Sequence, residues 1–223
     1  MRMLATFEKT ERLRHIGHLD IMRAMQRALR RSGLPVSYSK GFNPHILLTF
    51  ASALSVGAAG KREIMEATLD EDVGPEAFLS AMNAALPPEM QLTSARAIDE
   101  RRPASMAMVQ AAAYDIRVLD AGAADVLREA LPGFLAQAEI ITDRKTKSGM
   151  KPCDIRPLLE EVSMEGDRLH AVMTLTETLS CKPSMLTAAL CAYAGAEVPR
   201  VMVTRERLFG RDASGALRPL EEM

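Results

Sequence analysis

The sequence predicts an α+β fold made of two ferredoxin-like halves, in which antiparallel sheets carry their helices on one face. Two observations lead to this prediction. Segments with strand and helix patterns follow one another in the order β-α-β-β-α-β, and a similar order recurs in the second half of the chain. The length of 223 residues, of which 48% are hydrophobic, is enough for two small domains with buried cores.

In the first half, apolar alternation predicts four strands, at 3–8, 46–51, 63–69 and 91–98. The short segment 36–38 must also pair as a strand if the order is to be β-α-β-β-α-β. A second helix is expected to begin at Pro75, because proline fits the first helical turn, and to end before Pro87-Pro88. Its inner face would hold Phe78, Leu79, Met82 and Leu86.

The first helix is predicted over 18–31. Its apolar stripe consists of residues at spacings of three and four, widened by Met25: Leu19, Met22, Gln26 and Leu29. Ser32-Gly33 is expected to end the helix, and Pro35 prevents it from resuming.

The second half repeats the order of elements without repeating residues. Strands are predicted at 114–118, 139–142, 155–162, 169–175 and from 201, and helices at 123–131 and 184–193. Pro132-Gly133 is expected to interrupt the first of these helices. A polar stretch at 101–109 is the predicted linker, which gives a basic N-terminal domain at 1–100 and a C-terminal domain at 110–223.

Charge is distributed unevenly, although the net charge is only −1. Residues 1–50 contain nine Lys/Arg against three acidic residues, and residues 60–100 contain three against nine. The sequence has no apolar stretch of membrane-spanning length, and an acidic residue interrupts the N-terminus before a signal-like apolar run develops. Three scattered cysteines indicate neither a disulfide scaffold nor a zinc ribbon. We therefore expect a cytoplasmic protein.

A row of arginines lies opposite the apolar stripe of the 18–31 helix. Asp20, Arg23, Arg27 and Arg31 share a face, and Arg30 borders it. Guanidinium groups match phosphate geometry because each can donate two parallel hydrogen bonds. The row is either a solvated helix face with one ion pair or a surface that binds anions or nucleic acid. Further basic residues precede it, namely Lys9, Arg12, Arg14 and His15.

The segment 38–45 combines two aromatic residues, a lysine, a glycine and an Asn-Pro turn. Gly41 and Asn43 permit unusual backbone angles. Phe42 could anchor the loop in the core, or it could stack on a nucleic-acid base, and Tyr38 and His45 face the same choice.

Histidines near the start of the first helix suggest two further possibilities. His15 and His18 have an H-x-x-H spacing, and His45 could approach them, but zinc requires at least three protein ligands. A histidine could instead act as a general acid–base on RNA together with Asp20.

A second basic segment lies at 142–156. Five bases, Arg144, Lys145, Lys147, Lys151 and Arg156, stand against Asp143 and Asp154. The segment is either a solvated hairpin tip or half of a composite phosphate-binding cleft. None of the glycine-rich nucleotide-binding, nucleophile-elbow or H-E-x-x-H motifs occurs in the chain.

These residues resemble the radical SAM-linked protein family, a bacterial domain of unknown function encoded beside, or fused to, a cobalamin-type radical SAM protein. The resemblance lies in Lys9, Arg14-His15-Ile16-Gly17-His18-Leu19-Asp20, Arg23, Arg27, Arg30-Arg31, Leu34-Pro35, Tyr38-Ser39 and Gly41-Phe42-Asn43-Pro44. Lys147-Ser148-Gly149 and Asp154-Ile155-Arg156-Pro157 are similar to a second signature of that family. The resemblance implies a radical SAM protein as partner, and the family's gene neighbourhoods imply RNA metabolism.

We therefore expect an RNA-binding accessory protein that works with a radical SAM protein in the modification or processing of tRNA or rRNA. One alternative is a metal-independent RNA nuclease or RNA-modifying enzyme that uses His15 or His18 with Asp20. Another is a protein-interaction subunit without RNA contact. No cofactor, metal ion or membrane contact is expected, and Tyr38 and Phe42 are the expected stacking residues. The expected phosphate-binding residues are Lys9, Arg14, Arg23, Arg27, Arg30, Arg31, Lys40, Arg144, Lys145, Lys147, Lys151 and Arg156.

Overall fold

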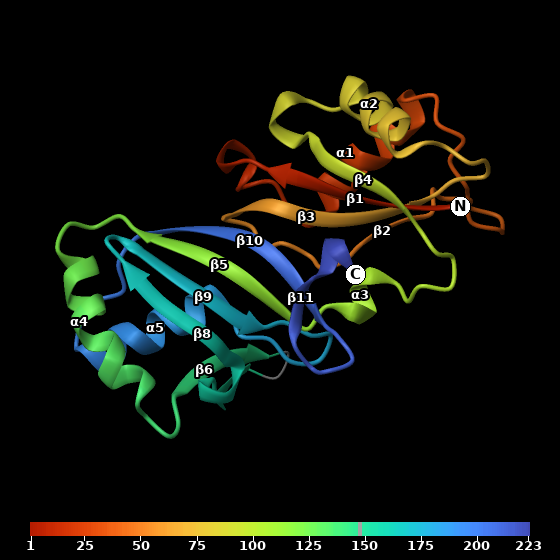
Figure 1. Cartoon of the computed structure of the whole chain (residues 1–223). Helices are drawn as coiled ribbons and strands as arrows, with labels where there is room; N and C mark the ends of the chain where they lie inside the picture. The colour runs from red at the N-terminus through yellow and green to blue at the C-terminus, as the bar shows by residue number, and fades with distance from the viewer. Residues whose placement is uncertain (147–148) are drawn as a thin grey trace. The chain divides into compact units, whose positions relative to one another are not determined.

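The computed structural model describes residues 1–146 and 149–223, which form two compact units (Figure 1). Unit 1 consists of Met1–Gln110 together with Arg205–Met223, and unit 2 consists of Ala111–Thr204. The chain thus leaves unit 1 after residue 110 and returns to it at residue 205. The domain prediction differs from this division, because it assigned all of 110–223 to one C-terminal domain.

Unit 1 contains the elements β1 (Arg2–Lys9), α1 (His18–Arg31), β2 (Leu48–Phe50), β3 (Ala58–Thr68), α2 (Pro75–Ala85) and β4 (Leu92–Ile98). The strands pair antiparallel in the order β4-β1-β3-β2. Val36 and Tyr38 form only isolated bridges, to Leu69 and Ile46. The element order is therefore β-α-β-β-α-β with β2 and β3 as the middle strands, and 36–38 is not needed as one of them.

The stretch predicted to be a linker has structure of its own and joins the core of unit 1. It contains the short helix α3 (Ser105–Met108). Within it, Arg102 donates a hydrogen bond of 3.1 Å to the buried Glu66, and the Ser105 amide donates one of 2.8 Å. The returning segment adds β11 (Leu217–Pro219), which pairs with β10 (Val201–Arg211).

Helices α1 and α2 cover one face of the unit 1 sheet (Figure 1). The prediction for α1 is confirmed at both ends, and Gly33, with φ +74°, follows the helix as expected for a C-terminal glycine. The inward stripe differs in part from the predicted one. Leu19 is 58% exposed, because it lies on the same side of the helix as Arg23, away from the buried Ile21. The buried residues of α1 are Ile21, Met25, Ala28 and Leu29.

Unit 2 contains β5 (Ala111–Val118), α4 (Ala123–Leu135), β6 (Ile141–Thr146), β7 (Gly149–Asp154), β8 (Leu159–Glu165), β9 (Arg168–Thr174), α5 (Pro183–Ala194) and the first residues of β10. The order β10-β5-β9-β8 repeats the arrangement of unit 1. Between α4 and β8 the chain inserts the hairpin β6–β7, a separate two-stranded sheet. The α+β class with antiparallel pairing is confirmed.

Two local predictions for unit 2 are wrong. Helix α4 continues through Pro132 to Leu135, so Pro132-Gly133 does not end it. The segment 143–146, expected to begin a basic turn after the strand at 139–142, instead extends β6 and pairs with β7. The three consecutive charged residues Asp143-Arg144-Lys145 leave this part of β6 without apolar alternation, which is why the pattern did not indicate a strand there.

No helix in the described ranges is long and apolar enough to cross a bilayer. The same ranges contain no group of three or more His, Cys, Asp and Glu side chains placed to hold a metal ion.

Candidate functional site: a basic helix face, an aromatic loop and a charged pocket

Helix α1 presents a face of arginines directly opposite its buried stripe. Arg23, Arg27, Arg30 and Arg31 are all exposed. Because α1 is packed against the sheet by its apolar residues, the backbone that carries these four side chains is held in place while the guanidinium groups face solvent. We call these four residues the arginine face.

The members of the arginine face differ in whether their guanidinium groups form hydrogen bonds within the protein. Arg23 donates a hydrogen bond of 3.1 Å to Asp20, and Arg31 donates one of 2.6 Å to the carbonyl oxygen of Ala85 at the end of α2. Arg27 and Arg30 form no hydrogen bond or ion pair with any residue that the structure describes. Both guanidinium groups are therefore available to an external anion.

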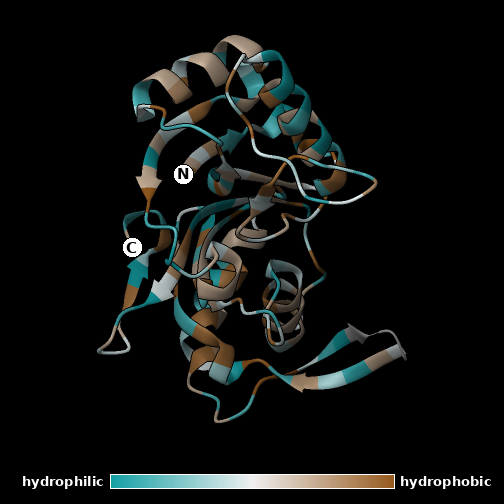
Figure 2. Ribbon diagram, turned by 90° about the vertical axis from the view of Figure 1, so that its right-hand side faces the viewer, coloured by the Kyte–Doolittle hydropathy of each residue, from teal (hydrophilic) through white to brown (hydrophobic). Residues whose placement is uncertain are grey.

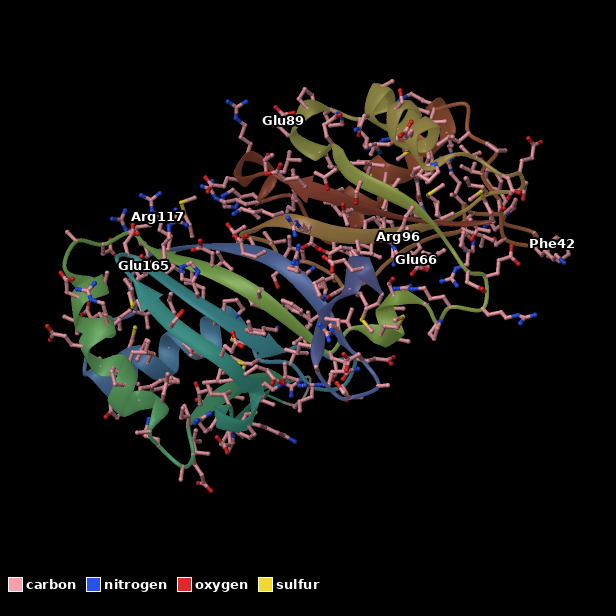
Figure 3. All side chains as sticks on the ribbon, in the orientation of Figure 1. Phe42, Glu66, Glu89, Arg96, Arg117 and Glu165 are labelled. Carbon is pink, nitrogen blue, oxygen red and sulfur yellow. The ribbon has the colours of Figure 1, made fainter. Side chains whose placement is uncertain are left out.

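The loop 38–46 projects from unit 1 with its aromatic tip in solvent. Phe42 is fully exposed, at 110%, and its side chain points away from the rest of the unit (Figure 3). Tyr38 is 46% exposed, and Lys40, Asn43 and His45 are also exposed. Of the two interpretations that the sequence left open for Phe42, anchoring in the core is excluded.

Hydrogen bonds across the base of the loop fix its shape. The Ser39 amide donates to the carbonyl oxygen of His45 at 2.8 Å, and the His45 amide donates to Ser39 Oγ at 3.1 Å. Ser39 Oγ also lies 2.8 Å from His45 Nδ1. Gly41, with φ +124°, makes the turn, a conformation that an L-residue rarely adopts. We call the contacts between Ser39 and His45 the Ser39–His45 clamp.

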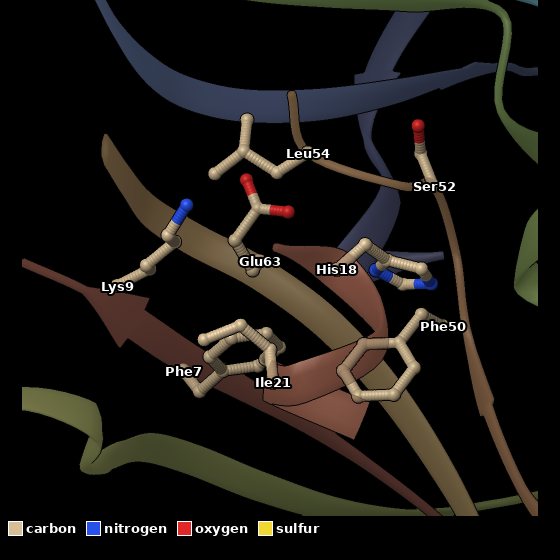
Figure 4. Close-up of a pocket in the computed structure, with 8 residues that line it drawn as sticks. All are labelled: Phe7, Lys9, His18, Ile21, Phe50, Ser52, Leu54 and Glu63. Carbon is tan, nitrogen blue, oxygen red and sulfur yellow. The ribbon is translucent and has the colours of Figure 1, made fainter. Parts of the chain in front are cut away.

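A small pocket lies at the N-terminal end of α1 and brings His18 close to buried charges (Figure 4). Its free volume of about 10 Å³ is close to that of one water molecule. The His18 ring packs edge-on against Phe50, with ring centroids 5.2 Å apart. The remaining lining residues are Phe7, Lys9, Ile21, Ser52, Leu54 and Glu63.

An ion pair is buried behind this pocket. Arg205 is 2% exposed and donates to both carboxylate oxygens of Glu63, from Nε at 2.8 Å and from Nη2 at 2.5 Å. Arg205 also donates to the Ser52 hydroxyl at 3.1 Å and to the carbonyl oxygens of Ser52 and Ala53. The pair is therefore bidentate and well satisfied, as a buried ion pair must be to offset its desolvation.

Lys9 is buried in the same region rather than displayed on the surface. It is 2% exposed, and its ammonium group donates to the carbonyl oxygens of Arg14 at 3.2 Å and Ala58 at 3.0 Å. Burial lowers the pKa of Lys9 below its usual value, with Arg205 adding to the effect and Glu63 opposing it. Lys9 is accordingly placed to join β1 to neighbouring backbone, not to meet a phosphate at the surface.

The same environment keeps His18 neutral near pH 7. Burial lowers the pKa of His18, the nearby Arg205 and Lys9 lower it further, and Glu63 opposes them. Asp20 does not act on His18, because it pairs with Arg23. His15 is exposed. The three residues considered for acid–base chemistry thus have separate surroundings, and the structure brings His18 together with Lys9 and Glu63 instead.

The predicted phosphate-binding residues of unit 2 lie on the β6–β7 hairpin and just after it. Arg144 lies opposite Lys151 in the pairing of the two strands, and Lys151 is exposed. In Figure 2 the hairpin alternates hydrophilic (teal) with more hydrophobic (brown) segments. Arg156 is tied to its own unit, because its Nε donates to the carbonyl oxygen of Leu135 at 3.2 Å. The predicted contribution of the Lys145 side chain and of Lys147 lies outside the described residues.

Arg144 also borders a cavity of about 470 Å³ in unit 2. Lys182, at the start of α5, lines the same cavity, so two cations face it.

Two further residues of unit 1 were predicted to bind phosphate. Lys40 is exposed on the aromatic loop, and Arg14 donates a hydrogen bond of 3.3 Å to the carbonyl oxygen of Glu11.

Sequence comparison covers both units of the fold. Residues 2–186 match a family described as uncharacterized proteins conserved in bacteria, DUF2344. The chain belongs to the bacterial family DUF2344. The matched range includes the arginine face, the aromatic loop and the hairpin β6–β7 of this DUF2344 protein. No curated protein sequence matches the chain.

Sequence reasoning missed the buried ion pair beside the pocket in this DUF2344 protein. Glu63 was assigned to a strand and Arg205 to none of the candidate sites. Arg205 follows Glu63 by 142 residues, so no local spacing could join them. Glu63 directly follows the basic residues Lys61 and Arg62 in β3, so its sequence neighbours gave no sign that the carboxylate is buried and needs a distant cationic partner.

Proposed function

We propose that this DUF2344 protein is an RNA-binding accessory protein that works with a radical SAM protein in the modification or processing of RNA. The observation that carries the proposal is the arginine face of α1. Four guanidinium groups lie on the solvent side of one anchored helix, and Arg27 and Arg30 have no partner among the described residues. Such a row fits a phosphate backbone, which presents anionic groups at regular intervals.

The partnership with a radical SAM protein is supported by the resemblance of the His18–Asp20 and Gly41–Pro44 segments to the radical SAM-linked family. In the proposal, unit 1 binds the RNA, and the partner supplies the chemistry. Catalysis by His15, His18 and Asp20 receives no support from their surroundings, because Asp20 pairs with Arg23 and His18 adjoins a pocket of single-water size.

The test is the double substitution Arg27→Ala and Arg30→Ala, with RNA affinity measured by fluorescence anisotropy over a range of salt concentrations. We expect weaker binding and a log–log salt slope that becomes shallower by about one for each phosphate that the variant no longer neutralises. The fold should be unaffected, since neither side chain bonds to the described protein.

The matched control is Arg117→Ala with Arg128→Ala, which removes the same charge from unit 2. Arg117 pairs with Asp167 and Arg128 with Asp125, so neither is available to RNA. Absence of RNA binding at low salt, or equal losses in both double variants, would refute the proposal. Co-purification with the radical SAM protein after nuclease treatment, in the absence of RNA binding, would indicate a protein-interaction subunit instead.

A further inference from the structure

Phe42 is the most exposed of the large hydrophobic side chains in the described part of the chain. An exposed benzyl group gains nothing for folding, because it buries no apolar area. Its two ring faces are both open to solvent. A flat aromatic surface of this kind is complementary to another flat ring, and nucleic-acid bases provide one.

Hydrogen bonds within unit 1 close the base of the loop that carries Phe42. The Ser39–His45 clamp closes its base, the bridge between Tyr38 and Ile46 continues the closure, and Gly41 supplies the left-handed turn. These contacts restrict the conformations that the loop base can adopt, which reduces the entropic cost when a ligand stacks on Phe42.

We infer that Phe42 is a stacking platform for an unpaired base, and that the RNA bound by this protein is single-stranded where it meets the loop. The inference rests on the proposed function and specifies its substrate class. In an A-form duplex the base faces are stacked on one another, so a protruding phenyl ring cannot reach them. In a single strand, a loop or a bulge the faces are accessible.

The charges around the ring suit a nucleotide better than an apolar protein surface. Lys40 lies two residues before Phe42 and is exposed, and the polar Asn43 and His45 follow it. A base on the ring would place its phosphate within a cationic and hydrogen-bonding surface. Tyr38 belongs to the clamped base of the loop and is only 46% exposed, which makes it a poorer platform than Phe42.

The direct test uses the absence of tryptophan from this sequence. The substitution Phe42→Trp introduces a single indole at the tip, and stacking on a base should quench its fluorescence. We expect quenching by a single-stranded RNA 12-mer and none by the same sequence annealed to its complement. The matched control is Val56→Trp, at an exposed residue in another turn of unit 1, where neither RNA should quench the indole.

Affinity provides the second measurement. Phe42→Ala should weaken binding of the single strand by about tenfold or more, the usual effect of losing one base–aromatic stack, and leave duplex binding unchanged. The variant should fold normally, because the Phe42 ring is fully exposed. Ser39→Ala should produce a smaller loss, since Ser39 positions the loop and does not touch the ligand.

Equal affinity for single strand and duplex, or an unchanged single-strand affinity in Phe42→Ala, would overturn the inference. If the arginine double variant still lost affinity, the proposed RNA binding would survive that result. If Phe42→Ala kept its RNA affinity but lost the radical SAM protein, the loop would be a protein-docking element. Failure of the wild-type protein to bind any RNA would remove both the proposed function and the inference.

Discussion

The neighbours of His18 in the structure differ from its neighbours in the sequence, and so does the role that they suggest. In the sequence it stands beside His15 and Asp20 in a pattern that invites a catalytic interpretation. In the structure its ring adjoins Phe50, and the charged groups that act on it are Arg205, Glu63 and Lys9. Its chemistry is therefore set by residues from three different strands.

The lowered pKa of His18 predicts a specific pH dependence of stability. In the unfolded chain the imidazole takes up a proton near its ordinary pKa of 6.5, whereas burial and the two cations resist protonation in the folded protein. The contribution of His18 to the free energy of unfolding is therefore fully present above pH 6.5. It is lost as the pH falls from 6.5 toward the lower pKa of the folded state. Urea unfolding measured between pH 7.5 and pH 5 should show this decline.

The variant His18→Gln should lose the part of the decline that His18 causes, so its unfolding free energy should fall less over the same pH range. His15→Gln is the matched control, because the His15 side chain is exposed. It should keep the wild-type pH dependence. A His18→Gln curve parallel to that of the wild type would contradict the assignment.

Among the elements, α4 and α5 illustrate how packing can override a local signal. Pro132-Gly133 normally ends a helix, yet α4 runs through both residues. Gly133 lies against Tyr193 of α5 so closely that a Cβ atom there would be 2.4 Å from the tyrosine hydroxyl oxygen. The glycine thus serves the approach of the two helices and not the termination of one.

Gly133→Ala should change the free energy of unfolding by no more than about 1 kcal/mol, as measured by thermal or urea unfolding, because alanine favours the helix while its methyl group must displace the end of the half-exposed Tyr193 side chain. Removing the hydroxyl relieves the closest approach, because the next tyrosine atom would lie 3.3 Å from the same Cβ atom. Gly133→Ala should therefore cost less in a Tyr193→Phe background than alone. Additive losses in the double variant would show that the hydroxyl is not the obstacle.

At the scale of the whole molecule, the C-terminal segment is part of unit 1 through Arg205. Arg205 forms an ion pair with Glu63. Among the described residues of unit 1, this is the one ion pair in which both side chains are less than 5% exposed. Removing one partner of such a pair leaves an uncompensated buried charge, which commonly costs about 3–5 kcal/mol.

Arg205→Met should consequently lower hydrogen-exchange protection in β1 and β3 of unit 1, while protection in β9 and α5 of unit 2 should change much less. Arg218→Met is a suitable control, because Arg218 is an exposed residue paired with Asp212. Equal loss of protection in both units, or none in unit 1, would contradict the prediction.

The sequence was informative where a local pattern determined the structure. The bounds of α1 follow from its amphipathic pattern and from Gly33 and Pro35, and the α+β class follows from the order of elements. Contacts distant in sequence were not accessible in this way. The pairing of Arg205 with Glu63 leaves no spacing signal, and the exposure of Phe42 depends on where the loop 38–46 leaves the sheet. Local chemistry could only limit Phe42 to two interpretations.

The return of the chain to unit 1 also determines when this unit can complete its folding during synthesis. The ribosome must add 142 residues after Glu63 before Arg205 exists, which at ordinary elongation rates takes roughly 7–28 s. During that interval the nascent polypeptide holds Glu63 without its cation, so unit 1 cannot reach its final stability before Arg205 has been synthesised. A message truncated inside unit 2 would yield a product with a defective first unit, which is a natural target for proteases.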